Sequence, residues 1–382
     1  MKKTSILCVG IGGYANTYLS SVLKQENPDF EIVGMVEVAP ERCPFYPQLR
    51  DMGVPLYASM EDFYREKTAD LAIITTPIHL HTRQILCALE NGSNVMCEKP
   101  LSGVSADEQL IAVKSEETGK FVIIGYQWSY SQAITDLKED IMQGLYGAPL
   151  FLKSLILWPR GNSYFTRGTG WAGKRTLADG TVVNDSVASN ATAHYIHNML
   201  YVTGGAVGKS SEVVSLQADL VRLNKIENFD TLTARMELDN GAKAIYIASH
   251  ATRDNVDPVL EYRFEKGTVT YGNGQTDIIG TFADGTVKNY GDPYLNTNNK
   301  VYEAIAQARG ESFTPRCGVK AAAAQVRCIE KLQENPIRDF RQEYVRTKED
   351  FLYVEGLDAL LLKCFEEEKL LSEYPEYSQM VK

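Results

Sequence analysis

Short apolar runs alternate with helical patterns over the first 128 residues. The apolar runs cover residues 5–9, 31–36, 71–75, 94–97 and 121–125. They lack the strict apolar–polar alternation of a half-exposed strand, which is typical of strands buried on both faces of a parallel sheet. Alternation of such strands with helices predicts right-handed βαβ crossovers and a doubly wound α/β domain.

The pattern changes after residue 145. An apolar stretch at 148–158 precedes a loop of about 25 residues rich in glycine, arginine and aromatic residues, a length that usually marks a functional or disordered segment. Residues 186–203 have a helical pattern. Strand-like runs between 210 and 290 are separated by turn signals, namely Asp239-Asn240-Gly241, Asn273-Gly274 and Asp284-Gly285. These signals predict an open, mostly antiparallel sheet.

Helical patterns return at 298–309, 319–333 and 349–372. We place one domain boundary near residue 128. Residues 1–128 would form the doubly wound domain, and residues 129–382 an α/β domain with the antiparallel sheet. A chain of 382 residues is long enough for two such cores.

Composition narrows the class of protein. The chain has 39 basic and 49 acidic residues, a net charge of −10 that argues against a nucleic-acid-binding surface. No apolar run approaches the ~20 residues of a membrane helix, and the start is too short for a signal peptide. The 7 cysteines form no Cys-x-x-Cys pair, as expected of reduced thiols. We therefore expect a cytoplasmic protein that binds neither nucleic acid nor membrane.

The first strand leads into a glycine-rich loop, Gly10-Ile11-Gly12-Gly13-Tyr14-Ala15, which fits G-x-G-x-x-A. Gly10 would permit the tight turn, Gly12 would let the backbone approach a pyrophosphate, and Ala15 would let the helix pack closely. The motif is weak alone, but its place between a strand and a helix strengthens it. We assign Gly10, Gly12, Gly13, Tyr14 and Ala15 to a dinucleotide cofactor.

The next strand ends at Glu37, which lies 22 residues after Ala15. A carboxylate there would accept hydrogen bonds from the adenosine ribose and repel a 2′-phosphate. This favours NAD over NADP. NADP stays an alternative because Arg42 could pair with a phosphate, and a solvated glutamate at a strand end is the plainer interpretation of Glu37.

Two further motifs follow the next strands: Thr76-Pro77-Ile78-His79-Leu80-His81, and Val95-Met96-Cys97-Glu98-Lys99-Pro100-Leu101. With the glycine loop, they resemble the glucose–fructose oxidoreductase / inositol dehydrogenase (Gfo/Idh/MocA) family, and Glu-Lys-Pro is the most specific element. The resemblance implies an N-terminal Rossmann domain, a C-terminal α/β domain with an open sheet, and a substrate held over the nicotinamide.

The resemblance also implies residue roles. The family lysine matches Lys99, which would face the nicotinamide and the substrate oxygen. Its place at the carboxyl end of a parallel strand agrees with this role, because doubly wound folds bind ligands there. The plainer interpretation is a lysine that pairs with Glu98. We assign five more residues to the cofactor site: Thr76, Pro77, His81, Glu98 and Gln127.

The family's second motif places two aspartates and a histidine on one helix. Here Asn190 stands at the first aspartate, His194 at the histidine and His197 at the second aspartate. On a continuous α-helix these three side chains would share one face, with Asn198 beside them. We assign His194 to catalysis and all three to substrate binding. Asp185 could cap the helix or replace the missing carboxylate.

Aromatic and cationic side chains of the long loop suit sugar stacking and binding of carboxylates or hydroxyls. They are Trp158, Arg160, Tyr164, Arg167, Trp171, Lys174 and Arg175. For any one of them ordinary loop surface is the plainer interpretation, but we include Trp171, Lys174 and Arg175 in the substrate site. A metal shared by His194 and His197 lacks a third ligand, so no metal is expected.

These assignments predict an NAD(P)-dependent oxidoreductase acting on a hydroxyl-bearing carbon of a sugar, sugar acid or cyclitol. One alternative is glycoside cleavage by transient oxidation with a retained NAD. Another is a catalytically degenerate NAD-binding regulator, motivated by the two replaced carboxylates. We also expect a homo-oligomer, a dimer or tetramer, because one apolar face of an open sheet needs covering and the family resemblance points to pairing through it.

Overall fold

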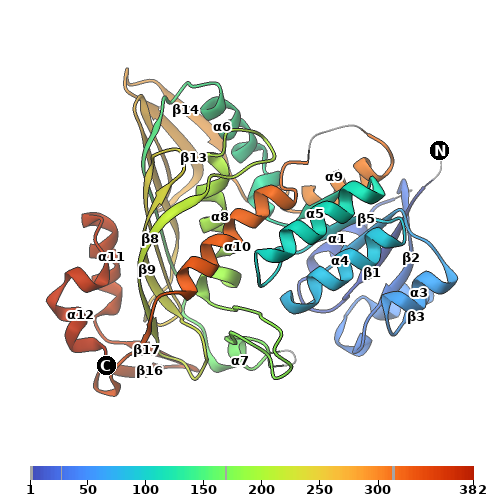
Figure 1. Cartoon of the computed structure of the whole chain (residues 1–382), viewed down its shortest axis with the longest axis horizontal. Helices are drawn as coiled ribbons and strands as arrows, with labels where there is room; N and C mark the ends of the chain where they lie inside the picture. The colour runs from blue at the N-terminus through green and yellow to red at the C-terminus, as the bar shows by residue number, and fades with distance from the viewer. Residues whose placement is uncertain (1–2, 27, 168–169, 312–314) are drawn as a thin grey trace. The chain divides into compact units, whose positions relative to one another are not determined.

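The computed structural model describes residues 3–26, 28–167, 170–311 and 315–382 (Figure 1). The chain divides into two compact units, the first comprising Met1–Ser131 and Asn296–Ala323 and the second Gln132–Leu295 and Ala324–Lys382. The single boundary expected at residue 128 therefore needs a correction. The chain returns to the first unit over residues 296–323, because a helix there packs against strands formed much earlier in the sequence.

Six parallel strands in the order β3-β2-β1-β4-β5-β6 form the sheet of the first unit. They are β1 (Thr4–Val9), β2 (Phe30–Val36), β3 (Leu56–Tyr57), β4 (Leu71–Ile74), β5 (Asn94–Cys97) and β6 (Val122–Ile124). All five expected runs form strands, and only the short β3 was missed. Every residue of β4 is buried, as expected of a strand with both faces covered. This strand order is that of a doubly wound Rossmann sheet.

The helices of the first unit follow the strands in the expected alternation. They are α1 (Ala15–Val22), α2 (Tyr46–Asp51), α3 (Met60–Glu66), α4 (His81–Glu90), α5 (Ala106–Thr118) and α9 (Asn299–Ala308). Short 3-10 turns are η1 (Pro40–Arg42), η2 (Ile78–Leu80) and η3 (Gln127–Tyr130). Helix α4 ends at Glu90, and Gly92 follows with a φ of 79°, which suits a residue after a helix end.

The second unit is built on a nine-stranded sheet in the order β14-β13-β12-β11-β7-β10-β9-β8-β15. Its strands are β7 (Pro149–Leu157), β8 (Val213–Arg222), β9 (Thr231–Leu238), β10 (Lys243–Ser249), β11 (Val256–Phe264), β12 (Gly267–Gly272), β13 (Gln275–Phe282), β14 (Val287–Gly291) and β15 (Ile337–Asp339). Only the pairs β7–β10 and β8–β15 are parallel. The expected mostly antiparallel sheet is thus confirmed.

The turn signals are found where the sequence places them. Asn273 and Gly274 join β12 to β13 with φ values of 54° and 87°. Two consecutive positive φ angles match the turn that fits the twist of a tight hairpin. Gly241 and Gly285 also have positive φ at the β9–β10 and β13–β14 turns.

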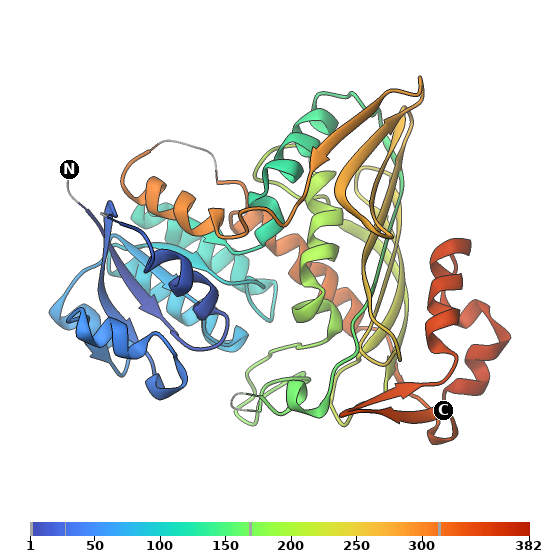
Figure 2. The ribbon, with the colours of Figure 1, turned by 180° about the vertical axis from the view of Figure 1, so that it is seen from behind.

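Helices cover both faces of the second sheet. They are α6 (Gln132–Met142), α7 (Asn162–Phe165), α8 (Ala193–Val202), α10 (Val319–Gln333), α11 (Leu357–Glu367) and α12 (Pro375–Met380). Helices α6 and α8 lie on one face, and α11 and α12 on the other (Figures 1 and 2). The helix expected at 349–372 is wrong in part, because its start forms a hairpin of β16 (Val345–Lys348) and β17 (Phe351–Val354).

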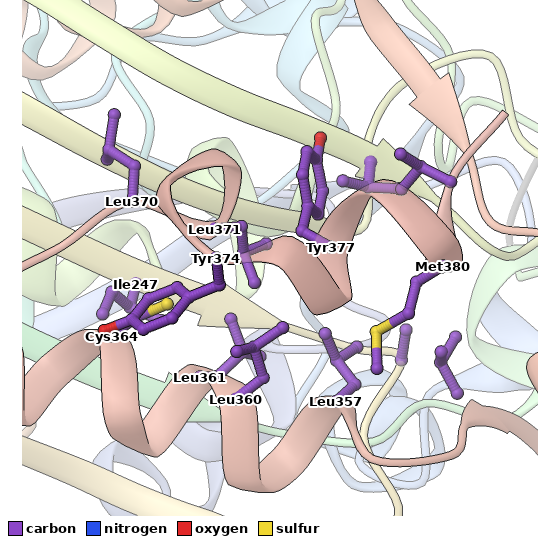
Figure 3. Close-up of a cluster of buried hydrophobic side chains, with 14 of the residues drawn as sticks. Ile247, Leu357, Leu360, Leu361, Cys364, Leu370, Leu371, Tyr374, Tyr377 and Met380 are labelled. Atoms are coloured by element: carbon purple, nitrogen blue, oxygen red, sulfur yellow. The ribbon is translucent and has the colours of Figure 1, made fainter.

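Residues 340–382, which we call the C-terminal cover, seal one face of this sheet. Leu357, Leu361 and Cys364 of α11 are fully buried against Ile247 of β10 (Figure 3). The 3-10 turn η6 (Leu371–Glu373) adds Leu371 to the same cluster. Burial of these side chains supplies the hydrophobic stabilisation that holds the cover in place.

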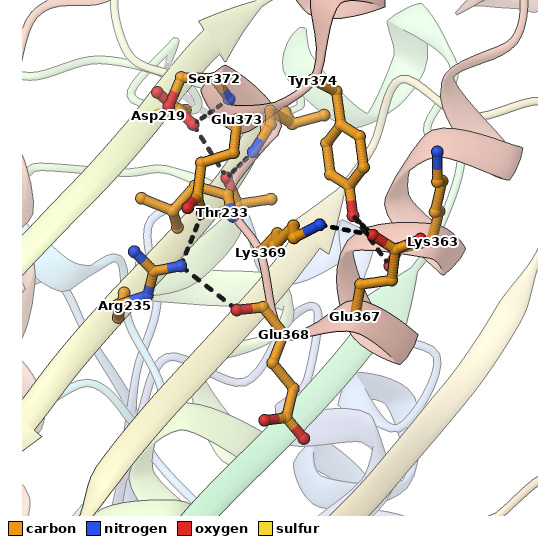
Figure 4. A network of polar contacts seen from close by, with 12 residues as sticks. Asp219, Thr233, Arg235, Lys363, Glu367, Glu368, Lys369, Ser372, Glu373 and Tyr374 are labelled. Carbon is orange, nitrogen blue, oxygen red and sulfur yellow. Dashed lines mark hydrogen bonds and ion pairs between the residues drawn. The ribbon is translucent and has the colours of Figure 1, made fainter.

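Polar contacts fix the register of the C-terminal cover on the strands (Figure 4). The Ser372 amide donates to Asp219 at 2.8 Å, and the Leu371 amide donates to the Thr233 hydroxyl at 3.1 Å. Arg235 forms an ion pair with Glu373 at 2.6 Å. The C-terminal cover thus buries apolar surface of β7, β8 and β10, and the expected homo-oligomer stays a prediction.

Candidate functional site

The glycine loop between β1 and α1 has the backbone geometry that the motif requires. Gly10 and Gly13 have φ values of 77° and 58°, which side chains other than glycine rarely adopt. A Cβ at Gly10 would approach the Thr76 side chain to 3.0 Å, whereas one at Gly13 would meet nothing within 4 Å. The loop is therefore close-packed against Thr76 at Gly10 and open at Gly13, which fits the approach of a pyrophosphate to backbone amides.

Glu37 follows β2 and binds the same loop. One carboxylate oxygen accepts from the amides of Ile11 at 2.9 Å and Gly12 at 3.3 Å. The other accepts from the amides of Val38 at 2.9 Å and Ala39 at 3.0 Å. The carboxylate is thus held beside the loop, where an adenosine ribose would lie if a dinucleotide occupied the motif.

His81 lies buried between two backbone carbonyls, and its assignment to the cofactor site stays a prediction. It is 1% exposed, and its two ring nitrogens lie 2.9 Å from the Thr76 carbonyl and 2.8 Å from the Pro100 carbonyl. Burial lowers the pKa of His81, and the hydrogen bonds to the two backbone carbonyls oppose that shift. The ring ties the turn after β4 to the Glu98-Lys99-Pro100 turn after β5. Thr76 and Pro77 belong to that first turn, and the Thr76 hydroxyl hydrogen-bonds Gln84.

Glu98 is engaged by a residue that sequence analysis missed. Lys300 of α9 is 0% exposed and pairs with the Glu98 carboxylate at 2.7 Å. Its ammonium also donates to the Gly125 carbonyl at 2.8 Å, and a Cβ at Gly125 would lie 2.5 Å from Glu98 Oε1. The second Glu98 oxygen accepts from the Lys99 amide at 3.3 Å. The buried pair thus anchors the backbone of Lys99, and the assignment of Glu98 to the cofactor site stays a prediction.

One signal could have identified Lys300. It lies on the apolar face of α9, with Val301, Ala304 and Ile305 as its buried neighbours. A lysine at a core position is rarely buried without an anionic partner. Its partner lies 202 residues earlier in the chain, so no local pattern could name it.

Lys99 is half-buried at the carboxyl end of β5. The loop at Gly10, the turn at Thr76 and Lys99 follow the neighbouring parallel strands β1, β4 and β5, so they lie at one edge of the sheet. Two more predicted cofactor residues meet nearby, because the Tyr14 hydroxyl donates to Gln127 Oε1 at 2.9 Å. Ligands of doubly wound folds bind at this edge.

The helix expected at 186–203 is broken. Residues Val187–Ala191 form a π-helical turn, η4, and α8 begins only at Ala193. Ser186 caps the turn through reciprocal hydrogen bonds with Ser189, and the Thr192 carbonyl accepts from the Tyr246 hydroxyl at 2.7 Å. The single helical face predicted for positions 190, 194 and 197 is therefore wrong. Such π turns are frequent at functional sites.

Asn190 does have a carboxylate beside it. Its amide donates to Asp185 Oδ1 at 3.0 Å, and the Gly173 amide donates to Asp185 Oδ2 at 2.6 Å. Asp185 is buried and does not cap the helix, since Ser186 does. Asp185 thus places a negative charge beside Asn190, close to the position where the family motif has an aspartate. His194 is half-buried, with its ring centroid 6.5 Å from that of Tyr195.

His197 faces the core, which corrects its assignment to substrate binding. It is 1% exposed and stacks on Tyr201 with ring centroids 5.5 Å apart. Burial, with the nearby charge of Lys138, lowers the pKa of His197 to about 3. Asn198 is also buried and donates to the Tyr262 hydroxyl at 3.3 Å. The expected polar stripe on this helix is thus reduced to His194.

The three predicted loop residues differ in their surroundings. Lys174 pairs with Glu227 at 2.6 Å, and Arg175 donates to the Gln333 carbonyl at 3.1 Å. Both cations are thus engaged in contacts within the second unit. Trp171 is half-buried, with the Arg167 guanidinium 5.1 Å from its ring centroid.

Among the residues that the structure describes, no group of three or more His, Cys, Asp or Glu side chains could hold a metal ion. Over the same residues, no helix is long and apolar enough to span a bilayer.

Both units match models of one protein family. Residues 4–126 match an oxidoreductase family with an NAD-binding Rossmann fold (GFO_IDH_MocA), and residues 134–270 match the GFO/IDH/MocA C-terminal domain. The scyllo-inositol 2-dehydrogenase (NAD(+)) of Bacillus subtilis is 31% identical over 69% of this chain and 66% of its own length. The 1,5-anhydro-D-fructose reductase of Ensifer adhaerens is 26% identical over 44% of this chain and 49% of its own. The matches thus span two thirds or less of these curated relatives.

Solved structures share the fold. The WlbA dehydrogenase from Bordetella pertussis, in complex with NADH and UDP-GlcNAcA, superposes with a TM-score of 0.70 at 20% identity, over 87% of this chain and 96% of that one. An oxidoreductase from Agrobacterium radiobacter, in complex with NAD+, L-tartaric acid and magnesium, gives 0.67 at 16% identity, over 86% and 94%.

Proposed function

Because this chain belongs to the Gfo/Idh/MocA family of oxidoreductases with an NAD-binding Rossmann fold, we propose that it oxidises or reduces a hydroxyl-bearing carbon of a sugar, sugar acid or cyclitol. One observation carries the proposal. Lys99 stands at the carboxyl end of β5, at the same sheet edge as the open glycine loop, with its backbone anchored to the buried Glu98–Lys300 pair. A half-buried ammonium held there suits a group that works on a substrate oxygen.

NAD fits the residues of the first unit. The glycine loop before α1 would hold its pyrophosphate, and Glu37 its adenosine ribose. NAD would supply the hydride acceptor or donor at its nicotinamide. Glu37 favours NAD over NADP, because its carboxylate would repel a 2′-phosphate at the position of the ribose.

Lys99 would donate a hydrogen bond to the substrate oxygen and stabilise negative charge that develops on it. We assign His194 to proton transfer with the hydroxyl of the substrate. Asn190 would orient groups near α8, and Asp185 behind it would supply the negative charge that favours a protonated imidazole.

Localisation and assembly follow as further proposals. All 7 cysteines are free thiols, and we propose that the protein works in the reducing cytoplasm. A homo-oligomer stays a prediction. It would have to use a surface other than the apolar area under the C-terminal cover, where Leu155 and Ile247 are already buried.

The function is tested by mixing the full chain with NAD and a panel of cyclitols, aldoses, alditols and sugar acids, and following the absorbance of the reduced cofactor. We expect turnover with at least one compound and a preference for NAD over NADP. Absence of NADH binding by fluorescence titration would refute the proposal, whatever the panel returns.

A further inference from the structure

Two arginines of the second unit lack an acidic partner in a protein whose net charge is −10. Arg160 and Arg167 lie in the segment after β7, on either side of α7. Among the residues that the structure describes, neither guanidinium has a carboxylate oxygen within 4.0 Å, and Arg160 Nε is buried without a hydrogen-bond partner. Half-buried guanidiniums normally find an anion, because their five donors match its oxygens.

Aromatic rings hold both guanidiniums in place. Arg167 lies 3.6 Å from the ring centroid of Tyr164 and 5.1 Å from that of Trp171. Arg160 lies 5.4 Å from the ring centroid of Trp158 and 5.3 Å from that of Tyr164. Cation–π contacts orient a guanidinium and leave the N–H groups at its edge able to donate. The Nη1 of each guanidinium donates to a backbone carbonyl, Arg160 to that of Pro159 at 3.4 Å and Arg167 to that of Tyr164. The remaining donors of both groups can serve an anion.

His250 adds a vacant acceptor to this cluster. It is 1% exposed, and its Nδ1 donates to the Trp158 carbonyl at 2.7 Å. Burial and the charges of Arg160 and Arg167 lower the pKa of His250 to about 3, so the ring is neutral and Nε2 carries a lone pair. In the described part of the chain, this buried Nε2 has no partner. A hydroxyl group is the donor it can accept from.

The cluster is connected to the helix that bears His194. Trp158 packs edge-on against Tyr195, with ring centroids 5.6 Å apart. The pKa of Tyr164 is raised by burial and then by the charge of Asp185. Asp185 is not the missing counter-ion, because it accepts from Gly173 and Asn190 and forms no ion pair with either arginine.

We propose that Arg160 and Arg167 bind an anionic group of the substrate while His250 Nε2 accepts a hydrogen bond from a neighbouring hydroxyl. The inference rests on the proposed function in one respect, namely that the bound anionic group belongs to the substrate. It narrows the sugar, sugar acid or cyclitol to an acidic one, in which a carboxylate or a phosphate ester lies near a hydroxyl. Two planar guanidiniums bind either group by paired hydrogen bonds.

The test is direct binding, followed by tryptophan fluorescence. Two of the 3 tryptophans, Trp158 and Trp171, lie in the cluster. The full chain, with and without NAD, is titrated with glucuronate, glucose 6-phosphate, glucose and myo-inositol. We expect one or both of the acidic sugars to bind at least about tenfold more tightly than glucose, since a charge-assisted hydrogen bond contributes that much or more. Preference for glucuronate would identify a carboxylate, and preference for glucose 6-phosphate a phosphate ester.

The variants Arg160→Gln and Arg167→Gln should each weaken acid binding by about 10- to 100-fold. Arg167→Lys should bind the acid more tightly than Arg167→Gln and less tightly than the wild type, because lysine keeps the positive charge but not the paired N–H donors of the guanidinium. The matched control is Arg346→Gln, since Arg346 pairs with Glu355 on the β16–β17 hairpin. Circular dichroism identifies variants that fail to fold. If a glutamine variant does not fold, acid binding by Arg167→Lys tests the role of the guanidinium.

Two outcomes would overturn the inference: glucose binding as tightly as both acids, or acid binding that neither glutamine variant weakens. Failure of the proposed function gives a different pattern. If no compound reduces NAD while acids still bind through Arg167, the oxidoreductase proposal fails and the anion subsite stands. If neutral polyols are oxidised and acids bind no better than glucose, the function stands and the subsite is refuted.

Discussion

Glu37 accepts hydrogen bonds from four backbone amides, two of them in the glycine loop. Its carboxylate therefore has a fixed position where a 2′-phosphate of NADP would come. We predict that the wild type binds NADH more tightly than NADPH, and that the difference between the two affinities is smaller in Glu37→Ser. Fluorescence titration of both cofactors measures this. Glu41→Gln, a charge change at an exposed neighbour, is the control, and equal affinities of the wild type for NADH and NADPH would contradict the role of Glu37.

His197 makes a prediction about pH. The pKa of this buried ring is lowered from its usual value near 6.5 to about 3. Between these values the unfolded chain binds a proton that the folded chain does not, so the free energy of unfolding should fall as pH drops from 6.5 toward 3. One proton contributes at most about 1.4 kcal/mol per pH unit.

His197→Phe keeps a ring that can stack on Tyr201 but cannot be protonated. We predict a flatter pH dependence in this variant, measured by urea denaturation from pH 7 to 4. A slope identical to that of the wild type would mean that the buried ring accepts a proton in the folded state.

At the scale of elements, α9 is joined to the Glu98-Lys99 turn of the first unit by the buried ion pair of Lys300 with Glu98. Removing one partner of a buried pair leaves an uncompensated charge, which typically costs about 3–5 kcal/mol. We predict that Lys300→Met destabilises the chain by this order, measured by urea denaturation. Lys67→Met, at an exposed position, should change stability by less than about 0.5 kcal/mol. If Lys300→Met also lowered the free energy of unfolding by less than about 0.5 kcal/mol, the ion pair with Glu98 would not stabilise the fold.

The elements that the sequence predicts are those specified locally. The five runs form strands because the centre of each is apolar, and Asn273-Gly274 forms a turn because both residues tolerate positive φ. The break before Ala193 depends instead on the Tyr246 hydroxyl, which binds the Thr192 carbonyl across 54 residues. The same reason explains why His197 was placed on a substrate face and why Lys300 was missed. Their partners come from distant parts of the chain.

Of the candidate site, the glycine loop, Glu37 and the Glu-Lys-Pro turn lie where their motifs predict, since each motif follows a strand end. Lys174 and Arg175 could not be separated from Arg160 and Arg167 by sequence. All four are cations of one loop, and only the fold shows that Lys174 reaches Glu227.

At the scale of the whole molecule, the C-terminal cover packs on the sheet of the second unit. Leu361 is 0% exposed in this contact, whereas its neighbour Leu362 is 40% exposed. We predict that Leu361→Ala costs about 2–5 kcal/mol of unfolding free energy, as expected for a large-to-small change in a core. Leu362→Ala, the matched control, should change it by less than about 0.5 kcal/mol. Equal effects in urea denaturation would contradict a stable cover.

The central claim is that this chain is an NAD-dependent oxidoreductase in which Lys99 acts on the substrate oxygen. The most direct test is Lys99→Met beside Lys67→Met, assayed for NADH binding and for reduction of NAD with a substrate from the panel. We predict that NADH binding is unchanged in both variants. Turnover should fall by about 10²–10⁴-fold in Lys99→Met alone, as for loss of a group that assists proton transfer. Turnover of Lys99→Met within a few-fold of the wild type, with NADH binding intact, would contradict it.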